Sequence, residues 1–159
     1  MTSAFTTPIV TALSVRARLV RRGGTEDACR AWQTRLVQLS VWMEYWQMEC
    51  CGTPFRKDSE VSWRLRPAAD VDWLDTVLED GVAATIDAVE DHHGGSSAPP
   101  TVATVVSIAT VHCRFVPEPV AGSGVMTPVD EAKRWNSDLG DRRFAGFLVR
   151  LLTPETNDG

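Results

Sequence analysis

The sequence predicts an α+β domain in which one helix crosses a curved antiparallel or barrel-like β-sheet. Several segments alternate apolar and polar residues with the period of two that is typical of strands, and one segment has the three-and-four spacing of an amphipathic helix. At 159 residues, the chain is long enough to bury one hydrophobic core without disulfides or metal ions. We expect one compact domain over residues 36–153, preceded by a basic, loosely attached extension over residues 1–35 and followed by a tail over residues 154–159.

Two strands are expected on either side of residues 46–59. Residues 37–45 place Val37, Leu39, Val41, Met43 and Tyr45 on one face and Trp42 with the polar residues on the other, which is the pattern of a half-buried strand. Residues 60–66 alternate in the same way. Their inward-facing residues are Val61, Trp63 and Leu65. We expect these two strands to pair antiparallel, joined by a tight corner at the sequence CCGTPF.

The helix is expected to run from Asp70 to about Asp91. Aspartate is a favoured N-cap residue, and more aspartates follow in the first turn, where the helix dipole favours negative charge. We expect Gly81 to kink or split the helix, and His92 and His93 to lie in its last turn before the connector GGSSAPP. The residues of its apolar face are Val71, Leu74, Val77, Leu78, Val82, Ile86 and Val89.

The C-terminal half supplies two further strands. Residues 101–115 are the most β-branched run of the chain and are apolar on both faces, which predicts a long central strand. Residues 117–142 form a Pro- and Gly-rich excursion, with one short helix expected around residues 131–135. Residues 142–152 alternate again and predict a closing strand.

The net charge of −5 hides an asymmetry between two parts of the chain. Residues 1–35 hold six arginines and two acidic residues, whereas residues 36–159 hold ten basic and nineteen acidic residues. Because an acidic surface repels phosphate backbones, nucleic acid is a poor candidate partner for the body of the protein. No stretch approaches the roughly 18–20 apolar residues that cross a bilayer, so we expect no membrane partner.

The basic extension allows three interpretations: a targeting peptide, an interaction arm or an irrelevant addition. A secretory signal carries its positive charges before its apolar core, whereas here residues 8–13 precede the arginines. We therefore expect a mobile tail. We also expect the working domain to begin near Val37, with the upstream residues arising from a start codon placed too early.

Four cysteines, Cys29, Cys50, Cys51 and Cys113, are spread along the chain. A disulfide framework is typical of small secreted domains, and this chain shows neither that size nor a secretory signal. We expect reduced thiols and a cytoplasmic location.

The segment WQMECCGTPF, followed by the short alternating strand EVSW, resembles the signature of an uncharacterised bacterial family of small proteins, classed as domain of unknown function family 6578. The later segments VHCRF and GFLVRLL are similar to the C-terminal half of that family, so the resemblance covers about residues 37–152. Family members usually place a Gly-Asp turn before the second strand, where this chain has Lys57, Asp58 and Ser59. The resemblance implies one compact domain and supplies no activity.

The double cysteine allows a metal interpretation. Thiolates and imidazoles suit tetrahedral zinc, which would join Cys50 or Cys51 to Cys113, His112 or the pair His92 and His93. The spacing argues against zinc, because structural sites usually pair ligands two to four residues apart, and adjacent residues on a strand point to opposite faces. We expect no cofactor and keep zinc as the alternative. The candidate thiol or metal residues are Cys50, Cys51, His112 and Cys113.

A catalytic thiol is a second interpretation, with one of the histidines as base and a carboxylate such as Asp91 orienting it. The sequence holds no nucleophile elbow, phosphate loop or H-E-x-x-H motif to support an enzyme. A third interpretation, a vicinal disulfide between Cys50 and Cys51, requires a distorted peptide. We expect instead that CCGTP packs a tight corner and that no catalytic residue is present.

Two of the tryptophans suggest a further interpretation, a ligand-binding surface. An exposed edge of Trp42 and Trp46 beside two arginines would suit a peptide or a small anionic ligand, with the loop over residues 117–142 as a lid. In the alternative, the crossing helix covers Trp42 through Leu74 or Leu78. The candidate ligand-binding residues are Trp42, Trp46, Gln47, Arg64 and Arg66.

Together these patterns predict a small binding or regulatory module of unknown ligand, a small molecule or peptide, without enzymatic activity. Its site is expected among residues 45–56, the Trp42 and Trp46 edge and residues 117–142. The alternative is a thiol- or zinc-dependent protein that uses Cys50 and Cys51.

Overall fold

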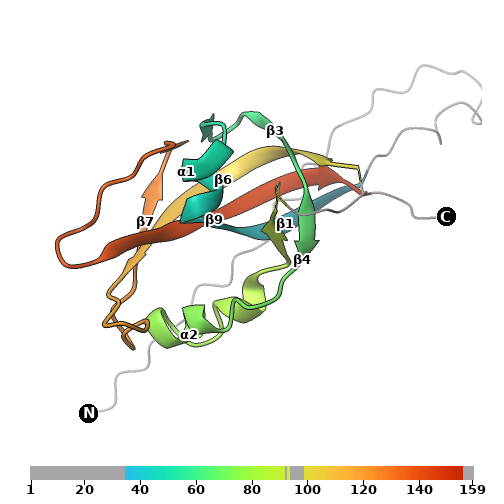
Figure 1. The fold of residues 1–159 in the computed structure, drawn as a ribbon. Coiled ribbons are helices and arrows are strands. Elements are labelled where there is room, and N and C mark those ends of the chain that lie inside the picture. Colours follow the sequence, from blue (N-terminus) through green and yellow to red (C-terminus); the bar gives the residue numbers. More distant parts are fainter. Residues whose placement is uncertain (1–34, 92, 94–98, 156–159) are drawn as a thin grey trace, which may run out of the picture. The chain divides into compact units, whose positions relative to one another are not determined.

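The fold is a seven-stranded mixed sheet with a small two-stranded sheet beside it (Figure 1). The structure, a computed structural model, describes residues 35–91, 93 and 99–155, so the predicted extension and most of the GGSSAPP connector lie outside the described residues. The large sheet has the order β3-β6-β9-β1-β5-β4, with β7 also paired to β6. Its strands are β1 (Leu36–Glu44), β3 (Glu60–Trp63), β4 (Leu65–Pro67), β5 (Ala88–Glu90), β6 (Thr101–Cys113), β7 (Val125–Val129) and β9 (Arg143–Pro154). The small sheet pairs β2 (Phe55–Arg56) with β8 (Glu131–Ala132).

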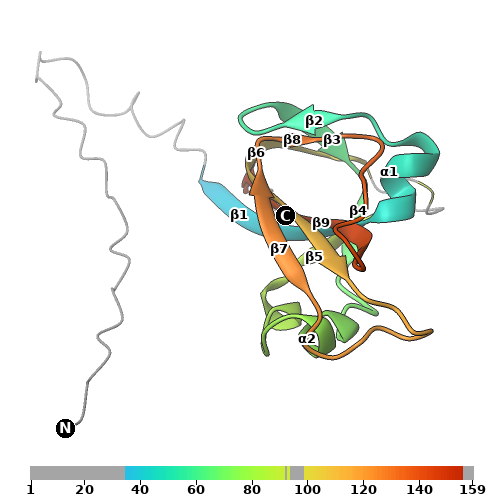
Figure 2. The same ribbon diagram turned by 90° about the vertical axis from the view of Figure 1, so that its left-hand side faces the viewer.

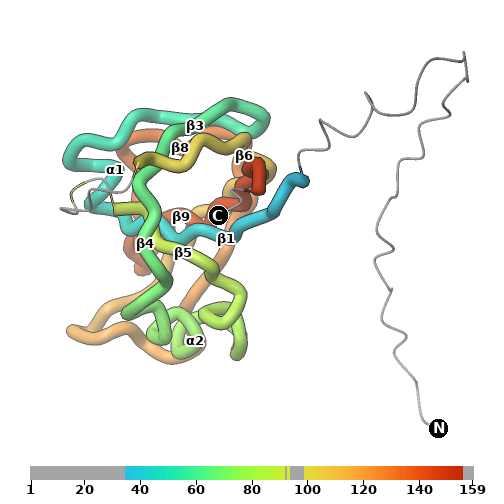
Figure 3. Tube along the Cα trace, turned by 90° about the vertical axis from the view of Figure 1, so that its right-hand side faces the viewer, coloured from blue at the N-terminus to red at the C-terminus, as the bar shows by residue number. Residues whose placement is uncertain are grey.

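The predicted curved, barrel-like sheet is confirmed as a curled half-barrel (Figure 2). Its two edge strands, β3 and β4, are consecutive in the chain and only Arg64 separates them. A link of one residue can join opposite ends of a six-strand path only if the sheet curls until those ends meet. The chain can be followed across this closing side from β3 to β4 in Figure 3.

The three long strands lie where the sequence predicted them. β6 is central, because it pairs with β3, β7 and β9. β9 lies between β6 and β1. All pairs are antiparallel except β1 with β5, which is parallel. The sheet is therefore mixed, whereas the sequence predicted an antiparallel one.

The strand over residues 37–45 and the strand over residues 60–66 do not pair with each other, so that prediction is wrong. β1 lies between β9 and β5, while the second segment divides into β3 on β6 and β4 on β5. Alternation along one strand depends on which face is buried, and it carries no information about the neighbouring strand.

The prediction of one long helix from Asp70 to Asp91 is also wrong. The segment holds a five-residue helix, α2 (Trp73–Val77), one turn of 3₁₀ helix, η1 (Ala83–Thr85), and then β5. Asp70 and Gly81 have left-handed backbone angles, with φ of 59° and 89°, which a continuous helix does not allow. The N-cap of α2 is Asp72 rather than Asp70.

The long excursion over residues 117–142 contains strands where a short helix was predicted. Residues 131–135 include β8, which pairs with β2, and β7 precedes it on the edge of the large sheet. Among the described residues, no helix is both long enough and apolar enough to span a membrane.

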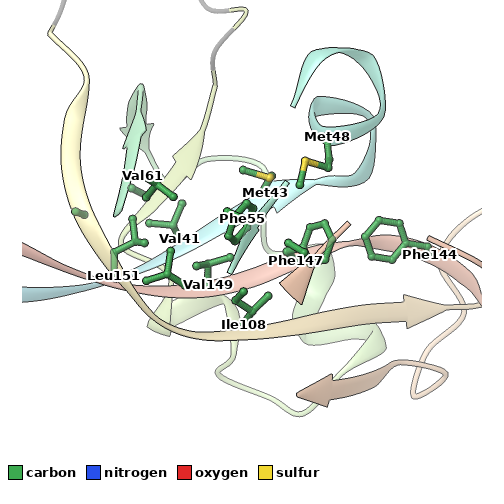
Figure 4. Close-up of a cluster of buried hydrophobic side chains, with 14 residues drawn as sticks. Val41, Met43, Met48, Phe55, Val61, Ile108, Phe144, Phe147, Val149 and Leu151 are labelled. Carbon is green, nitrogen blue, oxygen red and sulfur yellow. The ribbon is translucent and has the colours of Figure 1, made fainter. Parts of the chain in front are cut away.

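Both faces of the sheet are covered by separate clusters of buried side chains. The first cluster lies on the side of α1 (Tyr45–Cys51) and includes Met48, Phe55 and Phe147 (Figure 4). The second lies on the side of α2 and includes Trp42 and Leu74. Neighbouring residues of β1 alternate between these clusters, as a two-residue period requires.

Candidate functional site

The double cysteine lies on a helix. Residues 45–51 form α1, so both cysteines lie on a helix and the prediction that CCGTP forms a tight corner is wrong for them. The chain turns only at Gly52, whose N–H donates to the Met48 carbonyl at 3.1 Å. Gln47 and Met48 are the buried residues of this helix. Cys50 and Cys51 are exposed at its last turn.

Helix α1 meets the end of β5 because β1 and β5 are parallel neighbours, so both strands run out at the same end of the sheet. The side chain of Gln47 connects α1 to the residues at the end of β5. Its Nε2 group donates to the Glu90 carbonyl at 3.5 Å and to Asp91 Oδ1 at 3.4 Å.

This juxtaposition brings His93 to the double cysteine. The Cys51 Sγ atom lies 2.7 Å from His93 Nε2. One ligand atom from each of Cys50, Cys51 and His93 lies within 4.8 Å of the other two, and all three residues are exposed. The indole of Trp46 stacks on the His93 imidazole, with 5.5 Å between ring centroids and 25° between planes.

The electrostatics of the cluster do not favour a nucleophilic thiolate. Local desolvation is the largest effect and raises the pKa of the Cys51 thiol, and the hydrogen bond and charge of Cys50 raise it further. The Arg134 guanidinium acts in the opposite direction and lowers the pKa of Cys51 by less. Thiol nucleophiles of enzymes have lowered pKa values, so the raised pKa of Cys51 gives no support to an activated nucleophile.

A cavity of about 610 Å³ opens beside the cluster. Pockets of roughly 300–1,000 Å³ hold small organic ligands in proteins. Glu90, which is only 1% exposed, lines this cavity together with Cys51. The other lining residues come from β1, α1, β2, β3 and β8 and the segments between them: Met43, Met48, Gly52, Thr53, Pro54, Phe55, Arg56, Ser59, Glu60, Val61, Ser62, Trp63 and Glu131.

The predicted ligand-binding residues separate into two groups. Trp42 is 1% exposed and packs edge-on against Trp73 at 5.9 Å, so an exposed edge that includes Trp42 is wrong. The alternative holds, since Trp42 shares its buried cluster with Leu74 and Leu78. Trp46, in contrast, is 39% exposed.

Three of the predicted residues gather around Asp91. Gln47 donates to the Asp91 carboxylate, and the Arg66 Nε atom lies 3.3 Å from Asp91 Oδ2. The backbone N–H of Asp91 donates to the Arg64 carbonyl at 2.9 Å. The Arg66 charge therefore faces a carboxylate, which weakens the case for an anionic ligand at this edge.

His112 and Cys113 do not belong to the Cys50, Cys51 and His93 cluster. Cys113 is fully buried in the second core cluster, and burial raises the pKa of its thiol. His112 is buried against Phe144, and its Nε2 group donates a hydrogen bond to the Ser137 carbonyl at 3.2 Å. The sequence signal that does reach the cluster is the tandem histidine, of which His92 lies outside the described residues.

The loop predicted as a lid contributes to two hollows of the described part of the domain. Glu131 lines the cavity of about 610 Å³, and its Oε2 atom lies 3.6 Å from Arg56 Nη2. Residues 117–119 line a second hollow of about 470 Å³ with Tyr45 and Trp73. A lid movement of this loop stays a prediction.

The fold and the site define a small half-barrel β-domain with a thiol–imidazole cluster at the edge of the cavity of about 610 Å³. Residues 37–153 match the model of DUF6578, a family of unknown function, and the chain belongs to this family. The predicted membership of this family is thereby confirmed. No curated protein and no solved structure shows significant similarity to the chain.

Proposed function

We propose that this domain is a non-enzymatic binding module that holds a small organic molecule in the cavity of about 610 Å³. The cavity is the observation that carries the proposal, because its volume suits such a ligand and its lining mixes apolar side chains with a few polar ones. Residues 51–56 and Glu131 line it, so two of the three segments that the sequence singled out contribute to this site.

The charge of the lining favours a cationic ligand. Three carboxylates, from Glu60, Glu90 and Glu131, line the cavity against the single guanidinium of Arg56, which is already paired with Glu131. A carboxylate near an apolar wall attracts an ammonium group more strongly than it would in bulk water.

The apolar part of the lining favours a ligand with an aromatic or aliphatic body. Phe55 and Trp63 contact each other edge-to-face at 4.9 Å, and both line the cavity with Met43 and Met48. Aromatic faces also attract cations directly. The proposed ligand class is therefore a primary amine with an apolar body, in place of the peptide or small anionic ligand expected at the tryptophan edge.

A cytoplasmic location is part of this proposal. It is supported by the three described cysteines, which form no disulfide with one another and are therefore compatible with a reducing compartment.

The test is NMR titration of the full chain with three matched probes: 2-phenylethylamine, 2-phenylethanol and 3-phenylpropionate. We expect the amine to shift resonances of the cavity lining at lower concentration than the alcohol, and the carboxylate to shift them least. Equal responses to the amine and the carboxylate, or shifts confined to other parts of the domain, would contradict the proposal.

Two variants that each replace a carboxylate with a neutral amide sharpen this test. Glu60 is an exposed residue of the cavity rim, so Glu60→Gln should weaken amine binding several-fold, by on the order of 1 kcal/mol or less. Glu79 is exposed and does not line the cavity, so Glu79→Gln is the control and should bind the amine as the natural protein does.

A further inference from the structure

We propose that Cys50, Cys51 and His93 bind one zinc ion. This site goes beyond the cavity proposal, since Cys50 and His93 do not line the cavity. Two thiolates and an imidazole form the soft, nitrogen- and sulfur-bearing ligand set that zinc prefers among the common divalent cations of the cell.

The geometry needs little rearrangement to accept the ion. The three ligand atoms already lie within 4.8 Å of one another. Zinc–sulfur and zinc–nitrogen bonds of about 2.3 Å and about 2.0 Å place tetrahedral ligand atoms about 3.5–3.8 Å apart. The distance of 2.7 Å between Cys51 Sγ and His93 Nε2 would therefore open by less than about 1 Å as the ion enters.

The surrounding residues hold the ligands in place. Trp46 precedes Cys50 by one helical turn on α1, so the helix carries both the first thiol and the indole that stacks on His93. The indole N–H of Trp46 in turn donates to the Glu44 carboxylate. Residues that orient a metal ligand in this way usually contribute strongly to metal affinity.

Arg134 supports the other side of the site. Its guanidinium donates to the Cys50 carbonyl at 2.6 Å and to the Glu49 carbonyl at 3.3 Å, which satisfies two backbone oxygens in the last turn of α1. Its positive charge also offsets the negative charge of two thiolates. Because Arg134 comes from the segment after β8, this contact fixes α1 against a distant part of the chain.

Three protein ligands leave one position of a tetrahedral zinc ion for water or another small ligand. Sites of this kind differ from closed structural sites, which have four protein ligands. Cys51 lines the cavity as well as the cluster, so the ion would lie at the edge of the cavity.

The test is zinc binding by the full chain, reduced and freed of metal with a chelator, in competition with a chromophoric chelator. We expect one zinc ion per chain. Each of Cys50→Ser, Cys51→Ser and His93→Gln should weaken zinc binding by more than about tenfold, and Trp46→Leu by about tenfold. The control variant Cys113→Ala, which changes a buried thiol of the second core cluster, should bind zinc as the natural protein does.

Cobalt(II) provides a second, spectroscopic readout of the thiolate ligands. Two thiolate ligands give the cobalt-loaded natural protein a strong sulfur-to-metal charge-transfer absorption, which Cys50→Ser should reduce by about half. The proposal is overturned if zinc does not bind stoichiometrically, if the three cluster variants keep full affinity, or if Cys113→Ala abolishes binding. Amine binding should persist in Cys50→Ser, so each proposal can fail independently of the other.

Discussion

Cys51 and His93 place a thiol sulfur 2.7 Å from an imidazole nitrogen, although they are 42 positions apart in the sequence. The parallel pairing of β1 with β5 produces this contact, because α1 follows β1 directly and His93 follows β5 at the same end of the sheet. A helix continuing to Asp91, as the spacing of apolar residues predicted, would have left His93 at a helix end and not at the end of a strand. The site thus depends on β5, a strand of three residues.

The anchoring of α1 to β5 through Gln47 can be measured. Gln47→Met keeps the approximate volume and removes the Nε2 donor that serves the Glu90 carbonyl and Asp91. We expect a loss of about 1–2 kcal/mol in the free energy of unfolding, measured with urea. Gln38→Met, on the exposed side of β1, is the control and should change stability by less than about 0.5 kcal/mol. Equal effects of the two variants would show that these hydrogen bonds do not stabilise the contact.

The two tryptophans at the junction of β1 and α1 should differ strongly in their contribution to stability. Trp42 is 1% exposed and Trp46 is 39% exposed. Trp42→Ala removes a buried indole from the second cluster, so we expect a loss of about 3–5 kcal/mol in unfolding free energy. Trp46→Ala should lower stability by no more than about 1 kcal/mol. A Trp46 effect as large as that of Trp42 would contradict the described burial.

Thiol reactivity should separate the cysteines by exposure. Cys50 and Cys51 are exposed and Cys113 is buried. The experiment uses a Cys29→Ser variant freed of metal, so that only these three thiols are counted. We expect two thiols to react with a chromogenic disulfide reagent in the native protein and the third only in denaturant. Three fast thiols, or none, would be inconsistent with this structure.

The buried Cys113 thiol predicts a decline of stability at alkaline pH. Its pKa is raised by burial above 9.0, whereas in the unfolded chain the thiol ionises near its ordinary value. The folded state therefore binds the proton more tightly, and this contribution is complete at neutral pH and is lost as the pH rises through and beyond about 9.

The comparison that isolates this effect is urea unfolding of the natural protein and of Cys113→Ala at neutral pH and at pH values around 10. Stability should fall with rising pH in both proteins, but less in Cys113→Ala, because the other titrating groups are common to the two. An equal fall in both would mean that Cys113 does not lose its proton more easily on unfolding.

The candidate site was only partly predictable from the sequence. The WQMECCGTPF segment points to Cys50 and Cys51, but the candidate set that the sequence predicts completes them with His112 and Cys113 and leaves the tandem histidine as an alternative. His112 and Cys113 do not join the cluster, because a strand pattern does not reveal which cluster a residue joins. The irregular pairing between β6 and β9 at Val111 and His112 is a further feature that no alternation pattern encodes.

The sequence by itself determined the strands β1, β6 and β9 and the barrel-like character of the sheet. Burial of one or both faces imposes a local two-residue or β-branched pattern, and that pattern can be read without knowing the partners. Only the tertiary structure decided that α2 ends after five residues, that β5 pairs with β1 in parallel, and that Trp42 is covered. These features depend on contacts between residues far apart in the chain, and such contacts override local helix and strand preferences when they bury more apolar surface.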